Sequence, residues 1–112
     1  MRFPVDCSKM KFRVAIPPRP DMDFEVGRQK IRGGALMVVA TLSAMNGEEG
    51  EYIRVRYPGD GVKFSQDDPV IPVDLFALHW SINGRSGMAF GAEFLRLEDA
   101  PTLQVKEIKS GL

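Results

Sequence analysis

Residues 27–34 concentrate positive charge beside glycines. The cations Arg28, Lys30 and Arg32 occupy alternate positions within this segment, and an extended backbone points alternate side chains in the same direction. The flanking glycines would let the chain bend, or let its backbone approach a ligand closely. We therefore expect the three cations to share one face that can follow a row of phosphates.

A second candidate surface lies on a predicted strand. Tyr52, Arg54 and Arg56 alternate along residues 51–57, so they would share one face of that strand. Cations that track phosphates, together with an aromatic platform for bases, are what sequence-tolerant binding of single strands requires. The competing interpretation is that both basic segments are solvated outer faces of strands that keep a neutral protein soluble.

Residues for catalysis or metal binding do not gather into a recognisable set. His79 is the only histidine and Cys7 the only cysteine, and neither stands in a nucleophile motif. The acid pairs at 48–49 and 67–68 lack the spacing of a calcium loop, and the glycine clusters match no phosphate-binding fingerprint. We expect no enzymatic activity, no cofactor, no metal and no small-molecule substrate. A strongly perturbed His79 beside a deep pocket would favour an enzyme instead.

The composition sets bounds on size, partners and location. The 112 residues suit one domain. Lys plus Arg and Asp plus Glu number 15 each, which excludes coating of nucleic acid through bulk positive charge but allows a basic stripe on one face. A lone cysteine indicates a reducing compartment, and we expect neither a signal peptide nor a membrane-spanning stretch. A cytoplasmic location follows as the expectation.

Alternating apolar and polar residues predict strands rather than helices. The expected strands are residues 10–16, 36–42 (with a helix as the rival), 51–57, 73–82 and 88–97. The prolines of segment 17–20 should stop the first strand, residues 24–31 form a weaker extended candidate, and residues 65–72 should form a polar loop. Asn83-Gly84 predicts a hairpin turn, and Gly91 predicts a bulge or bend.

Trp80 is the residue whose role is hardest to assign from the pattern. It could stack on a base, but strand alternation places it with Phe76, Leu78 and Ile82 on one apolar face. His79 would then lie half-exposed on the opposite face. We therefore expect Trp80 to pack in the core.

Short strands at this spacing predict an all-β fold. A small barrel of five or six strands, OB-fold-like, has the right size, and an SH3-like barrel or a small sandwich fits nearly as well. The barrel domain should span residues 10–100, after an N-terminal extension of residues 1–9. The C-terminal tail, residues 101–112, could add one edge strand or stay loose.

The second half of the chain resembles a known family. The matching stretches are Asp-Pro-Val-Ile-Pro-Val-Asp-Leu (68–75), Leu-His-Trp-Ser (78–81), Gly-Arg-Ser-Gly (84–87) and Phe-Leu-Arg-Leu (94–97). In this order they resemble the C-terminal half of filamentous-phage gene V single-stranded-DNA-binding proteins, and residues 27–34 resemble the basic DNA-binding wing of that family. More broadly the chain resembles the replication, integration and excision activator proteins of actinobacterial plasmids, through residues 84–90.

The resemblance implies an OB-fold, a homodimer and cooperative coating of single-stranded DNA. It implies contacts to DNA from the two basic segments, namely Arg28, Lys30, Arg32, Tyr52, Arg54 and Arg56. The chain departs from the phage proteins because residues 27–34 contain no aromatic residue, and because segment 17–20 and the tail are extra.

We therefore expect a non-enzymatic single-stranded-DNA-binding protein of a phage, plasmid or integrative element, acting in replication or transfer. We do not expect it to bind a membrane. One alternative is a protein-interaction module that recruits a replication or excision partner without touching nucleic acid. A second is a structural or virion component.

Overall fold

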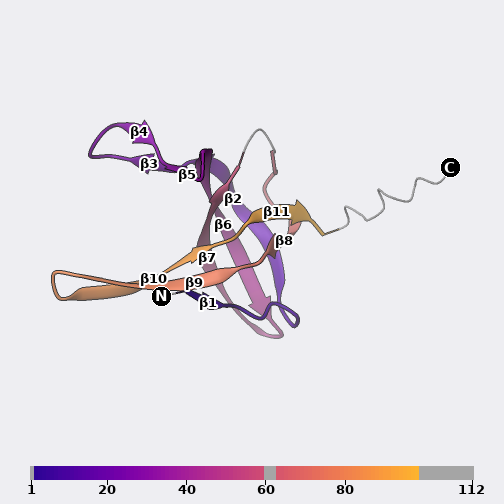
Figure 1. Cartoon of the computed structure of the whole chain (residues 1–112). Coiled ribbons are helices and arrows are strands. Elements are labelled where there is room, and N and C mark those ends of the chain that lie inside the picture. The colour runs from indigo at the N-terminus through magenta and orange to yellow at the C-terminus, as the bar shows by residue number, and fades with distance from the viewer. Residues whose placement is uncertain (1, 60–62, 99–112) are drawn as a thin grey trace.

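The computed structural model describes residues 2–59 and 63–98, and these form strands joined by turns (Figure 1). The strands are β1 (Arg2–Pro4), β2 (Lys11–Pro20), β3 (Met22–Asp23), β4 (Arg28–Gln29), β5 (Ile31–Arg32), β6 (Ala35–Asn46), β7 (Glu49–Pro58), β8 (Pro69–Val73), β9 (Phe76–Ile82), β10 (Arg85–Gly91) and β11 (Phe94–Leu97). No helix occurs in the two described stretches. The tail assigned to residues 101–112 lies outside the described residues.

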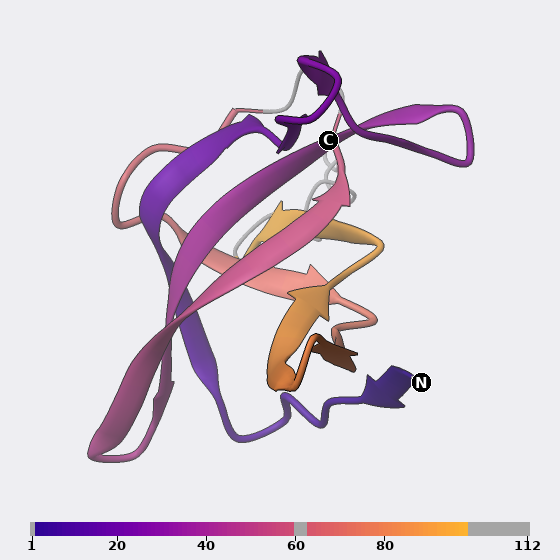
Figure 2. The same ribbon diagram turned by 90° about the vertical axis from the view of Figure 1, so that its left-hand side faces the viewer.

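One curled sheet holds nine of these strands. Their order is β1-β9-β10-β7-β6-β2-β8-β11, with β5 beside β6. β7 and β10 run parallel. β8 and β9 lie near opposite ends of this order. Only Asp74 and Leu75 separate them in the sequence, so the sheet must curl to bring its two ends close together. Figure 2 shows the resulting half-barrel, which confirms the prediction of a small all-β barrel-like fold.

The core fills the inside of the curl. Val14, Leu42, Val55 and Val70, from β2, β6, β7 and β8, are fully buried. Alternate residues of a strand point to opposite faces of the sheet, so the intervening residues of β6 and β7 form an outer face. The outer face of β7 carries the second basic segment.

The first strand does not stop at its prolines, contrary to the prediction. β2 continues to Pro20 and still pairs with β6 at Arg19 and Pro20, after two shifts of register. Its other edge pairs with β8 only at Phe12 and Arg13. The remainder is an edge strand. Proline is tolerated there because the amide of an edge residue can face solvent, so the sheet loses no hydrogen bond when that amide is absent.

Residues 24–31 do not form one extended segment, and this prediction is also wrong. β3 pairs with β4 around a turn at residues 24–27, and we call this hairpin, residues 22–29, the wing. β5 then pairs with β6 around Gly33 and Gly34. Their φ angles are 59° and 83°, values that glycine adopts without strain. Two consecutive hairpins therefore replace the single strand.

The remaining differences concern strand boundaries. Residues 65–72 are not all loop, because β8 begins at Pro69. The strand expected over residues 73–82 breaks at Asp74, whose φ is 56°. Residues 2–4, expected in an extension outside the domain, form β1 against β9. β10 ends at Gly91, where a bend was predicted, and β11 pairs with β8 instead. The strands are therefore more numerous than the five or six expected.

Candidate nucleic-acid interface

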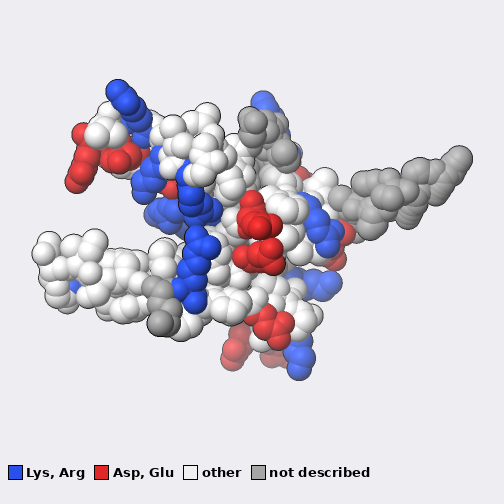
Figure 3. Space-filling model, viewed as in Figure 1, with Lys and Arg blue, Asp and Glu red and all other residues white. Residues whose placement is uncertain are grey.

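Two arms project from the same side of the half-barrel. They are the wing and the hairpin of β9 and β10, which we call the ribbon; both point left in Figure 1. In the space-filling view, lysine and arginine side chains gather in the hollow where the two arms meet the body (Figure 3). The ribbon itself is almost free of charged atoms on this face. The basic surface is therefore concentrated between the arms.

A cavity of about 260 Å³ opens at the root of the wing. Its charged lining residues are four cations and one acid, namely Arg19, Lys30, Arg54, Arg56 and Asp21. They come from the end of β2, the residue after β4, two positions on β7 and the residue after β2. The charged lining therefore carries three more cations than acids, in a chain whose net charge is zero. Such local excess attracts polyanions whatever the total charge.

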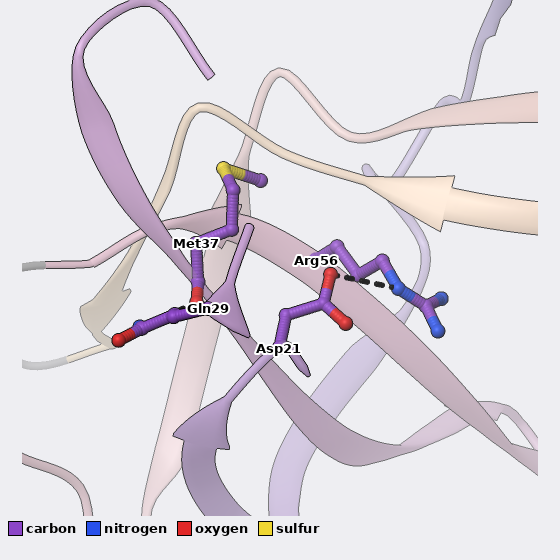
Figure 4. Close-up of polar contacts among 4 residues, drawn as sticks. All are labelled: Asp21, Gln29, Met37 and Arg56. Carbon is purple, nitrogen blue, oxygen red and sulfur yellow. Dashed lines mark hydrogen bonds and ion pairs between the residues drawn. The ribbon is translucent and has the colours of Figure 1, made fainter. Parts of the chain in front are cut away.

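Asp21 holds one of these cations in place. Its Oδ2 atom accepts a hydrogen bond from Nε of Arg56 at 3.1 Å (Figure 4). The backbone amide of Asp21 donates to the carbonyl of Met37 at 3.0 Å, and its carbonyl accepts from the amide of Lys30 at 2.8 Å. Gln29 Nε2 also donates to the Met37 carbonyl, at 2.8 Å. Because the ion pair uses Nε, the two terminal nitrogens of Arg56 point away from Asp21 (Figure 4) and can donate to a ligand.

The other three cations of this cavity are not neutralised in this way. Within residues 2–59 and 63–98, ion pairs join only Arg56 to Asp21 and Lys11 to Glu98. The second pair lies on exposed side chains, at 3.4 Å. The remaining cations of the cavity are therefore available to phosphate oxygens.

A second cavity, of about 320 Å³, adjoins the first because Arg54 and Arg56 line both. Its other lining residues are mainly aromatic or apolar, namely Glu51, Tyr52, Ile53, Trp80, Met88, Ala89 and Phe90. Tyr52 is 73% exposed and Trp80 39% exposed. Rings and guanidinium groups thus meet along one continuous surface.

Trp80 does not pack in the core, contrary to the prediction. β9 turns Ala77 inward, at 5% exposure, whereas Trp80 and Ile82 on the opposite face are 39% and 62% exposed. The reason is that β9 leaves the half-barrel with β10 as a two-stranded ribbon (Figure 1), whose apolar face has no second layer over it. His79 is exposed as well.

The structure brings together four of the six contact residues predicted from the sequence. Lys30, Arg54 and Arg56 line the first cavity, and Tyr52 joins the two arginines along the second.

The other two predicted contacts lie apart from both cavities. Arg28 is exposed on β4 and Arg32 is exposed on β5, and neither lines the first or the second cavity. Lys30, which lies between β4 and β5, is therefore the cation of residues 27–34 that reaches the first cavity.

Sequence reasoning missed or misassigned several lining residues. Arg19 lies within the proline segment and Asp21 directly follows it, where the shifted register of β2 leaves no readable alternation. Phe24 lines the first cavity from the turn of the wing and is 91% exposed. It lies just before residues 27–34, where no aromatic residue was found. An aromatic residue close to the basic segment in the sequence was therefore the signal that could have identified Phe24 as a candidate.

Groups for covalent or metal chemistry are sparse in the described part of the chain. Burial, and secondarily the Asp6 carboxylate, raises the pKa of the Cys7 thiol, which lowers the fraction of reactive thiolate. No three His, Cys, Asp or Glu side chains of residues 2–59 and 63–98 gather as metal ligands. These residues also contain no helix that is long and apolar enough to cross a membrane.

No family model, curated protein or solved structure matches the chain. The charge, shape and aromatic lining of the two cavities therefore carry the functional argument.

Proposed function

We propose that the chain is a non-catalytic single-stranded-DNA-binding protein of a mobile genetic element, acting in replication or transfer. The observation that carries the proposal is the pair of adjoining cavities that share Arg54 and Arg56. Four cations line the first cavity, and the second adds the rings of Tyr52, Trp80 and Phe90 to the two shared arginines. Phosphates would lie along the first and bases along the second, which is the division of labour in sequence-tolerant single-strand binding.

The exposed rings favour single strands over duplexes. Phe24, Tyr52 and Trp80 are 91%, 73% and 39% exposed and line one or other of the two cavities. An aromatic ring stacks on the face of an unpaired base, whereas in a duplex both faces of each base are covered by its neighbours. A duplex would therefore gain from the cations but not from the rings.

The position of the site on the fold gives a second, weaker support. OB-folds bind oligonucleotides on the face of their second and third strands and on two flanking loops. Here the corresponding elements are β6 and β7, flanked by the wing and the ribbon. This is an analogy of fold. The mobile-element context, a homodimer and a cytoplasmic location rest on the sequence resemblance and composition.

The direct test is fluorescence anisotropy with a labelled oligo-dT strand and a labelled duplex of the same length. The proposal predicts tighter binding of the single strand, and a loss of affinity when salt rises from low to moderate concentration. Equal affinity for the duplex, or no binding of either probe, would overturn it.

One observation favours a different function. Ile82 on the ribbon is 62% exposed and shares a face with the partly exposed Trp80, and apolar surface on a projecting ribbon can serve as a protein-binding site. A protein-interaction module would leave the anisotropy of both probes unchanged. It would instead form a stable complex with a replication or excision partner in pull-down experiments.

A further inference from the structure

The indole of Trp80 rests on a glycine. Trp80 on β9 and Gly87 on β10 are paired in the register of the ribbon. A Cβ atom placed on Gly87 would lie 2.7 Å from Cζ2 and 2.9 Å from Cε2 of the indole. The ring therefore occupies the space that any side chain at position 87 would fill. One face of the indole covers the glycine, and 39% of the residue stays exposed.

The same arrangement recurs nearby with its outer face covered. Phe76 and Gly91 are also paired in the ribbon, and a Cβ atom on Gly91 would overlap the Phe76 ring. The guanidinium carbon of Arg2 lies 4.1 Å from the centroid of that ring. A planar group thus stacks on the Phe76 ring, while no cation stacks on Trp80 within residues 2–59 and 63–98.

We propose that Trp80 is a stacking platform for one unpaired nucleobase, and that packing against Gly87 fixes the position of the indole before the base binds. This inference rests on the proposed function. Trp80 lines the second cavity with Arg54 and Arg56, so a base on the indole would belong to a nucleotide whose phosphate lies near the two guanidinium groups. Because the ring is packed before binding, little rotamer freedom is lost when the base arrives.

Trp80 is the only tryptophan of the chain, so its own fluorescence reports the contact. Saturating oligo-dT should quench that fluorescence. Trp80→Ala should weaken binding about tenfold, the usual effect of losing one stacked base, without changing the dependence of affinity on salt, because no charge is lost. Trp80→Phe keeps a ring and should retain most of the affinity. Arg54→Ala provides the opposite control, with a smaller salt dependence but quenching retained at saturation.

Gly87→Ala tests the arrangement without removing the ring. Gly87 does not have a positive φ angle, so alanine fits the backbone and adds only a methyl group where the indole lies. We expect weaker binding and altered tryptophan emission in the free protein. Ser86→Ala, at an exposed position one residue earlier, should change neither.

The outcomes separate the two proposals. If the parent raises the anisotropy of labelled oligo-dT but its fluorescence is not quenched, and Trp80→Ala binds as tightly, the platform is wrong and the proposed function survives. If the parent binds no oligonucleotide at all, the proposed function fails and the platform with it.

Discussion

Nε of Arg56 lies 3.1 Å from Oδ2 of Asp21, and this contact joins the root of the wing to β7. The Asp21 side chain is 8% exposed and the Arg56 side chain 35% exposed. Arg54, two residues earlier on the same face, is exposed and has no acidic partner within residues 2–59 and 63–98. Two arginines of one strand thus differ in that only Arg56 is tied to a buried carboxylate.

This difference predicts unequal effects on stability. Arg56→Ala leaves the buried Asp21 carboxylate without its charged partner, so the free energy of unfolding should fall by about 2 kcal/mol. Arg54→Ala removes an exposed side chain and should change it by less than about 0.5 kcal/mol. Urea unfolding measures both. Equal losses in the two variants would mean that the ion pair contributes nothing to the fold.

Two substitutions of Asp21 separate its charge from its hydrogen bond. Asp21→Asn removes a negative charge from the basic cavity but keeps an oxygen that can accept from Arg56 Nε, so oligo-dT should bind more tightly than to the parent. Asp21→Ala removes the same charge and also frees the guanidinium group, so it should bind more weakly than Asp21→Asn. Anisotropy at one fixed salt concentration measures the order. Identical affinities for the two variants would show that the orientation of Arg56 does not matter.

The two cations that follow the wing in the sequence, Lys30 and Arg32, should contribute unequally to DNA binding. Lys30 lines the first cavity, whereas Arg32 lies on β5 and lines neither of the two cavities. Lys30→Ala should weaken binding and lower the magnitude of the salt slope by about 0.7 for a single strand. Arg32→Ala should leave both nearly unchanged. If both variants lose affinity equally, the DNA also contacts the exposed side of β5, outside the cavity.

Tyr57 should make the fold sensitive to strong alkali. Its hydroxyl is buried without a hydrogen-bond partner in the described part of the chain, and burial raises the pKa of Tyr57 to about 12. A pKa that is higher in the folded than in the unfolded state means that the folded protein favours the neutral, protonated hydroxyl, and this preference contributes stability. This stability is fully present below pH 10, the usual tyrosine value, and is lost as the pH rises through 12.

The ionisation can be followed without interference. Tyr52→Phe removes the other of the two tyrosines, so the absorbance change at alkaline pH belongs to Tyr57 alone. We expect its midpoint near pH 12, with loss of the folded circular dichroism signal over the same range. Ionisation near pH 10 with the fold intact would show that the hydroxyl is solvated.

The sequence predicted strand faces well where alternation was regular. The alternation of residues 51–57 correctly separated Arg54 and Arg56 from the buried Val55, because β7 pairs with β6 along its whole length without a register shift and keeps the period of two. It failed for β9, since a period of two separates the two faces but does not say which one is buried. The small Ala77 faces the core, and the larger Trp80 faces solvent.

The residues of the site could be only partly predicted, because some of them lie where the strand pairing is irregular or turns back on itself. Arg19 and Asp21 reach the cavity through an irregular edge strand whose register shifts twice. Residues 24–31 look like one extended run, but β3 and β4 form a hairpin around a turn at residues 24–27. The register of β2 against β6 is set by the whole sheet and leaves no local signature in the sequence.

The salt dependence of oligo-dT binding tests the central claim most directly. The account assigns phosphate contacts to four cations, Arg19, Lys30, Arg54 and Arg56. It therefore predicts that the logarithm of the association constant falls against the logarithm of salt concentration with a slope of about −3. Arg54→Ala should make that slope shallower. Affinity that does not change between low and moderate salt would contradict the account.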